Sequence, residues 1–158
     1  MKPTLIRPNG LINDGTVKTF RPCHTFRFLI PDKEKRFSGF PILTEYIDGA
    51  DWKLVRDVSY QAHGGRLATV RSDFIFDWAS VPRIFWILFP PSGLPDQPYG
   101  IAALFHDWLY KHHEIEGRPI ERVTADLLFY EIMLYTGVDT LIARAMYRAV
   151  RLGGWWSW

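Results

Sequence analysis

Cysteine is almost absent from this sequence, since Cys23 is the only one among 158 residues. A single cysteine cannot form an intrachain disulfide, so packing must stabilise the fold, which suits a reducing compartment. Long apolar runs are absent as well. No stretch reaches the roughly 18 consecutive apolar residues of a membrane helix, and the opening MKPTLIRPNG lacks the apolar segment of a signal peptide. We therefore expect neither a transmembrane segment nor a signal peptide.

An excess of one charge is also missing, because 19 Lys and Arg are balanced by 17 Asp and Glu. Electrostatic binding of nucleic acid requires clustered basic side chains, so we predict no nucleic-acid partner. No repeat or low-complexity tract occurs, which excludes a solenoid. Aromatic residues, in contrast, make up 16% of the chain, and its last four residues are WWSW. We expect these C-terminal rings to offer a surface to a partner protein.

The two halves of the chain differ in hydrophobic period. The first 75 residues place short runs rich in β-branched and aromatic residues, such as HTFRFLI and RLATVRSDFIF, between turn signals such as AHGG. This pattern predicts three to five antiparallel strands, two of them joined by AHGG as a hairpin. The length favours a single domain over residues 1–158, with residues 1–50 as a β-rich N-terminal extension.

The second half has the spacing and punctuation of helices. We expect a short helix capped by Ser80, a helix from about Pro98 to His113, another from about Ile120 to Tyr135, and a last one along TLIARAMYRAVRL. Gly137 should end the third of these, and Asp139 should cap the fourth. Strands followed by helices predict an α+β fold, in which an antiparallel sheet precedes a bundle of three to four helices.

The last helix carries a basic stripe. Arg144, Arg148 and Arg151 fall at i, i+4 and i+7, opposite a run of apolar positions. The stripe is either a solvated outer face or a surface that meets phosphates or an acidic partner.

Ionisable residues interrupt two helices that otherwise read as buried. AALFHDWLYKHH contains His106 and Asp107, with Tyr110 one turn later, and VTADLLFYEIML contains Asp126 and Glu131. A charge moved into apolar surroundings must find a partner or change its protonation state. If the short connection makes the two helices antiparallel, Asp126 can approach His106.

Three interpretations of this group stay open. In the first, Asp126 holds one ring nitrogen of His106 and the other nitrogen activates water. In the second, the residues form a site for a divalent cation such as Zn²⁺, Mn²⁺ or Mg²⁺. Its ligands would be His106, Asp107, Asp126 and either Asp77 or His112. In the third, the network only locks the helices together.

Four segments resemble a phage and prophage family catalogued as domain of unknown function 1353: FIFDWASVPRIFWILFPP, GIAALFHDWLYKHH, TADLLFYEIMLYTGV and MYRAVRLGGW. The resemblance covers roughly residues 52–155. It implies a phage or prophage gene, with the protein in the host cytoplasm or the virion, and brings no established activity.

A narrower likeness concerns the two helices alone. AALFHDWLY followed by ADLLF is similar to the core helices of phospholipase A2 domains. The resemblance implies an esterase or phospholipase-like hydrolase acting on phospholipid. His106 would be its catalytic base, Asp126 would orient His106, Tyr110 would hydrogen-bond nearby, and Asp107 would bind calcium.

The sequence departs from those enzymes before the first of the two helices. They bind calcium through a glycine-rich loop, whereas LFPPSGLPDQPYG has only Gly93 and Gly100. Calcium takes about six to eight oxygen ligands, so Asp107 alone is insufficient. Asp77 would be a substitute ligand or the partner of a helix N-terminus. The competing function is a non-enzymatic virion, tail-assembly or host-interaction protein in which the His/Asp/Tyr network is structural.

Overall fold

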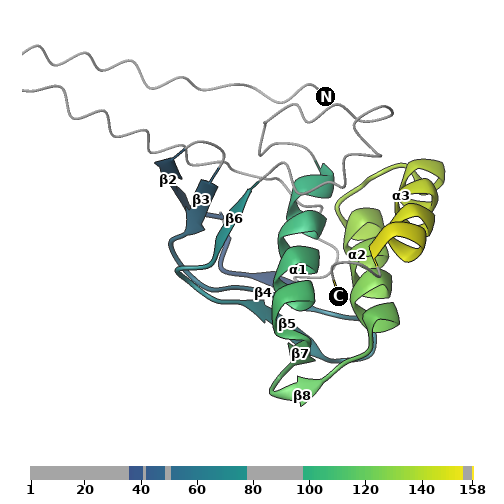
Figure 1. Cartoon of the computed structure of the whole chain (residues 1–158), viewed down its shortest axis with the longest axis horizontal. Coiled ribbons are helices and arrows are strands. Elements are labelled where there is room, and N and C mark those ends of the chain that lie inside the picture. The colour runs from purple at the N-terminus through teal and green to yellow at the C-terminus, as the bar shows by residue number, and fades with distance from the viewer. Residues whose placement is uncertain (1–35, 41, 49–50, 78–97, 155–157) are drawn as a thin grey trace, which may run out of the picture.

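The computed structural model describes residues 36–40, 42–48, 51–77, 98–154 and 158. Antiparallel strands precede three helices in these ranges (Figure 1), which confirms the predicted α+β class. The predicted strand HTFRFLI and the helix capped by Ser80 lie outside the described residues, as do Cys23 and residues 155–157.

The strands form two antiparallel sheets of three, where the sequence analysis expected one sheet. The first has the order β1-β4-β5, and the second has the order β2-β3-β6. The first contains β1 (Phe37–Ser38), β4 (Val58–Gln61) and β5 (Leu67–Val70), and the second contains β2 (Thr44–Asp48), β3 (Asp51–Leu54) and β6 (Ile75–Asp77). The chain changes sheet between β3 and β4. Gly39 passes so close to this corner that a Cβ there would collide with the carbonyl of Asp57.

The hairpin predicted at AHGG is confirmed. It joins β4 to β5, with Gly65 at positive φ and its N–H donating to the carbonyl of Ala62. Along β4, Val58 and Tyr60 are buried, as period-2 alternation requires. This sheet thereby presents an apolar face to the helices.

Three helices follow, with bounds close to those predicted. They are α1 (Pro98–His112), α2 (Arg122–Tyr135) and α3 (Thr140–Gly153). Gly137 has φ +89° just beyond α2, and the Asp139 carboxylate accepts hydrogen bonds from the N–H groups of Leu141 and Ile142. Both predicted end signals are confirmed. Between α1 and α2 lies a two-stranded ribbon that the sequence did not predict, formed by β7 (Glu114–Ile115) and β8 (Arg118–Pro119).

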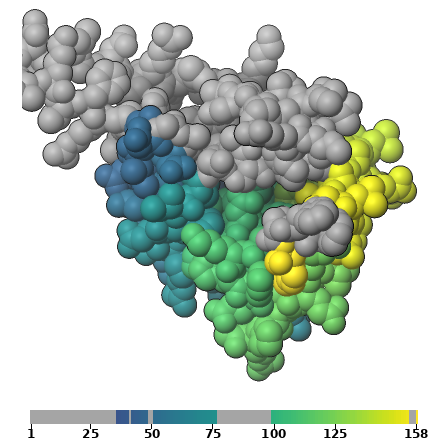
Figure 2. Space-filling model, in the orientation of Figure 1, coloured from purple at the N-terminus to yellow at the C-terminus, as the bar shows by residue number. Residues whose placement is uncertain are grey.

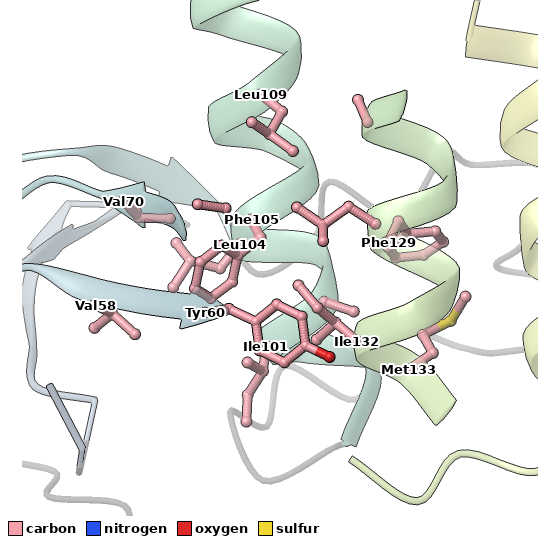
Figure 3. Close-up of a cluster of buried hydrophobic side chains, with 14 of the residues drawn as sticks. Val58, Tyr60, Val70, Ile101, Leu104, Phe105, Leu109, Phe129, Ile132 and Met133 are labelled. Carbon is pink, nitrogen blue, oxygen red and sulfur yellow. The ribbon is translucent and has the colours of Figure 1, made fainter. Parts of the chain in front are cut away.

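Helix α1 is central to the packing. Figure 3 shows it between the β4–β5 strands and α2, and Figure 1 places α3 on the far side of α2. Ile101, Leu104, Phe105 and Leu109 are at most 1% exposed. Because protein covers α1 on several sides, a polar side chain on its covered faces must find its partner inside the protein. No helix in the described ranges is long and apolar enough to cross a membrane.

Candidate functional site

The carboxylate of Asp126 on α2 is the centre of a buried polar network. Its side chain is fully buried. Its Oδ1 accepts hydrogen bonds from Nε2 of His106, at 2.9 Å, and from the hydroxyl of Tyr110, at 2.7 Å. Both donors come from α1, one turn apart. The structure thus brings together the three residues that the sequence analysis proposed for catalysis, across the antiparallel pair α1 and α2.

Helix α3 supplies a further donor that the sequence analysis did not foresee. Nη1 of Arg151 lies 2.8 Å from Oδ2 of Asp126. The expectation that Arg151 belongs to an outward basic stripe is therefore wrong, whereas Arg144 and Arg148 are exposed as expected. A signal was present in the sequence. With about 100° of rotation per residue, Arg151 is the arginine nearest the apolar face of α3.

Arg122, the first residue of α2, also connects α2 to α3. Its guanidinium donates to the carbonyls of Val150 and Arg151, at 3.3 and 3.1 Å, in the last turn of α3. A cation at a helix C-terminus stabilises the carbonyl groups left without partners there. The same guanidinium is 4.0 Å from Oδ2 of Asp126. Arg122 and Arg151 together connect α2 and α3 around this carboxylate.

The network keeps Asp126 ionised. Burial by itself would raise the pKa of Asp126, but hydrogen bonds from His106, Arg151 and Tyr110 outweigh it and hold the pKa below its ordinary value. Burial, with the neighbouring Asp126, raises the pKa of Tyr110, so its hydroxyl stays a proton donor. The hydrogen bond to Asp126 raises the pKa of Arg151. At neutral pH the site contains one carboxylate surrounded by donors.

His106 is held with one ring nitrogen committed. Its ring packs against the rings of Tyr110 and Phe129, at centroid distances of 4.1 and 4.9 Å, and its side chain is 11% exposed. An ionised carboxylate only accepts hydrogen bonds, so Nε2 of a neutral His106 carries the proton and Nδ1 carries the lone pair. Among the described residues, none forms a hydrogen bond with Nδ1. The ring is therefore oriented with a basic nitrogen away from Asp126.

Close packing at the end of α3 keeps Tyr110 in place. Gly154 is buried against it, and a Cβ at Gly154 would collide with the Tyr110 hydroxyl. The ring of Trp158 meets Tyr110 edge-on at 5.1 Å and stacks on His113 at 4.3 Å. Of the predicted C-terminal aromatic surface, this one described ring is half-buried against α1.

Of the residues proposed as metal ligands, the described part of the chain brings together only His106 and Asp126. Asp107 is half-buried on α1, and only the backbone of Asp77 is described, at the end of β6. His112 stacks on Trp108 at 3.6 Å, and its Nδ1 lies 2.9 Å from the Trp108 carbonyl. Within the described ranges, no three His, Cys, Asp or Glu residues are placed to hold a metal ion.

A second acidic residue of α2, Glu131, has a separate set of partners. Its Oε1 accepts from Nη1 of Arg36 at 3.1 Å, from the hydroxyl of Tyr60 at 3.0 Å and from the backbone N–H of His63 at 2.8 Å. These partners come from the residue just before β1, from β4 and from the hairpin. Asp126 therefore connects α2 to α1 and α3, whereas Glu131 connects α2 to the β-rich part of the chain.

Comparison with known proteins identifies a family and no activity. The family described as Protein of unknown function (DUF1353) matches residues 52–150, a range that includes His106, Tyr110 and Asp126. No curated protein and no solved structure matches the chain significantly. The phage origin and the likeness to phospholipase A2 stay predictions. The matched range covers more than half of the sequence, and the chain belongs to the DUF1353 family.

Proposed function

We propose that this protein is a hydrolase in which His106 is the general base that activates water, with esters, and phospholipid esters first among them, as substrates. One observation carries the proposal. A fully buried Asp126 carboxylate lies 2.9 Å from Nε2 of His106, so in the neutral ring that donates to it Nδ1 is the basic nitrogen. A carboxylate that fixes the tautomer and orientation of an imidazole is the usual way to prepare histidine for proton transfer.

The reaction would begin when Nδ1 of His106 takes a proton from water while the water oxygen attacks the ester carbonyl. The imidazolium formed in this step is stabilised through its Nε2–H by Asp126. The bond from carbon to the leaving oxygen then breaks, and the proton on Nδ1 passes to the leaving alkoxide. Tyr110 and Arg151 hold Asp126 throughout, so the carboxylate does not turn away from His106.

Two further features support phospholipid as the substrate class and a phage as the source. The order and spacing of His106, Asp107, Tyr110 and Asp126 resemble the core helices of phospholipase A2 domains. The four segments quoted above resemble phage and prophage proteins. We accordingly propose that the protein is phage-encoded and acts in the host cytoplasm or from the virion.

A divalent cation, Ca²⁺ or Zn²⁺, would supply stabilisation of the developing oxyanion if Asp107 held it. The described residues around Asp107 do not make such a site by themselves, so no step above depends on an ion. Metal content and the thermal midpoint with and without EDTA, Ca²⁺ or Zn²⁺ test this role. An ion-specific rise in midpoint that Asp107→Ala removes would support it, and an unchanged midpoint would count against it.

The alternative function is non-enzymatic, as a phage virion, tail-assembly or host-interaction protein. Arg151 favours this alternative, because its ion pair with Asp126 ties α3 to α1 and α2 as a structural lock would. A partner would then bind through the C-terminal aromatic residues. Truncation after Gly154 should abolish capture of such a partner, and normal capture by the truncated chain would contradict this alternative.

A hydrolysis screen tests the proposed function. Aryl esters and short-chain phospholipids would be incubated with the wild type, with His106→Gln and with His112→Gln. His112 is the matched control, because it lies on the same helix and its described contacts are with Trp108 and Phe74. We expect His106→Gln to lower the rate by about 100-fold or more, the range for a lost general base, with His112→Gln unchanged. An equal rate in His106→Gln and wild type would exclude His106 from the chemistry.

A further inference from the structure

The outer side of α3 combines exposed leucine and arginine. Leu141 and Leu152 are 75% and 80% exposed, more than any other large apolar side chain in the described ranges. Between them lie Arg144, Ala145 and Arg148, all exposed. The spacing places these residues along one side of the helix, opposite Ala143, Met146 and Val150, which are buried against the rest of the protein. Figure 2 shows α3, in yellow, at the edge of the molecule.

The charge of this face is not compensated within the described ranges. No acidic residue occurs from Thr140 to the end of α3, and no ion pair recorded among the described residues involves Arg144 or Arg148. Arg151, in contrast, points inward and is neutralised by Asp126. The outer face of α3 is therefore positive as well as partly apolar.

We propose that this face of α3 binds the surface of an anionic phospholipid bilayer. A helix that lies on a membrane inserts leucines at the boundary of the acyl chains while its arginines meet lipid phosphates. Leu141 and Leu152 stand at the two ends of the arginine pair, so both interactions can form at once. Nucleic acid would pair with the arginines but would leave the leucines in water, which makes the bilayer the better match.

The geometry also connects this surface to the candidate site. Arg151 lies between Arg148 and Leu152 in the sequence, and its guanidinium reaches Asp126 on the inner side of the same helix. That the bound phospholipid is also the substrate rests on the proposed function. The binding step does not, since it needs only the outer face of α3.

Vesicle sedimentation tests the inference with the full chain. The probes are vesicles of phosphatidylcholine with phosphatidylglycerol and vesicles of phosphatidylcholine alone. Arg144→Gln/Arg148→Gln should lower the partition coefficient on anionic vesicles about 25-fold, from roughly fivefold per arginine. Leu141→Ser/Leu152→Ser should lower it by about tenfold or more. Arg66→Gln/Arg118→Gln removes the same charge from exposed positions elsewhere and should leave binding unchanged.

Several results would overturn the inference. Wild type that ignores anionic vesicles, or an Arg144→Gln/Arg148→Gln variant that binds as wild type does, would exclude this surface. Binding to duplex DNA that exceeds vesicle binding and survives Leu141→Ser/Leu152→Ser would assign the face to a polyanion instead. His106→Gln separates the two proposals, because it should bind vesicles normally. Normal vesicle binding without hydrolysis would defeat only the proposed function, and ester hydrolysis without vesicle binding would defeat only this inference.

Discussion

Asp126 and Glu131 lie little more than one turn apart on α2, yet they end in different surroundings. Asp126 is fully buried and collects side chains from α1 and α3. The Glu131 side chain is 25% exposed and accepts hydrogen bonds from Arg36 just before β1, from β4 and from the hairpin. Both carboxylates accept from a tyrosine hydroxyl and an arginine. Only Asp126 accepts from an imidazole ring.

Under the proposed function, this difference separates a candidate catalytic group from a structural cross-link. In the Glu131 cluster the His63 ring lies against Arg36, and its backbone N–H is the group that reaches Glu131. That arrangement connects the β-rich part of the chain to α2. The Glu131 carboxylate does not orient the His63 ring there. At Asp126 the carboxylate instead orients His106, with a ring nitrogen left over. A buried carboxylate indicates a site when its donors include a group that can change protonation during a reaction.

The largest expected effect comes from removing each carboxylate. Asp126→Ala would leave three donors without their acceptor: the guanidinium of Arg151, the hydroxyl of Tyr110 and the imidazole of His106. We expect a loss of about 3–5 kcal/mol in the free energy of unfolding. Glu131→Ala should cost about 1–3 kcal/mol, because water can reach part of its cluster. Urea unfolding of both variants measures the difference. Equal losses would mean that the two junctions are energetically alike.

Two arginines of α3, one inward and one outward, should differ in their contribution to stability. Arg151→Met should lower stability by about 1–2 kcal/mol, a value reduced for the third of this side chain that remains exposed. Arg148→Met is the matched control on the outer face and should stay within about 0.5 kcal/mol of wild type. If the two variants unfold at the same urea concentration, Arg151 does not hold Asp126 in solution.

The two tyrosines test whether the clusters differ in function. Tyr110→Phe and Tyr60→Phe each remove one hydroxyl that donates to a carboxylate, and each should cost about 1 kcal/mol. Only Tyr110→Phe should also lower the rate of hydrolysis, because Tyr110 helps to hold Asp126 against His106. A matching fall in the activity of Tyr60→Phe would show that stability alone governs the rate.

The smallest effect concerns acid. The folded-state pKa of Asp126 is depressed below its ordinary value of 3.8, so its ionisation stabilises the fold above about pH 4. That contribution is lost as the pH falls below 3.8 towards the folded-state value. We therefore expect a steeper fall in stability between about pH 4 and pH 2 for the wild type than for Asp126→Asn. Parallel curves from urea unfolding would contradict the depressed pKa.

Local signals made much of the fold predictable. Gly137 and Asp139 act within one turn of their helix ends, and the apolar spacing of α1 and α2 placed both helices within two residues of their observed bounds. The pairing of His106 with Asp126 was also predictable, because a short connection makes the two helices antiparallel. The core of the candidate site could therefore be predicted from the sequence.

Features that depend on distant packing were not predictable in the same way. The split into two sheets and the short β7–β8 ribbon depend on which short strands pair, and strands of two to five residues carry weak patterns. The inward turn of Arg151 depends on how α3 docks on α2. A charge stripe by itself does not reveal which arginine has a buried partner.

The most direct test of the central claim measures hydrolysis and stability in the same His106→Leu protein. We predict that hydrolysis is lost while the free energy of unfolding falls by only about 1 kcal/mol, as for Tyr110→Phe, since Tyr110 and Arg151 still bind Asp126. Hydrolysis at the wild-type rate, together with a loss of roughly 1–3 kcal/mol, would show that His106 is a structural lock between the helices.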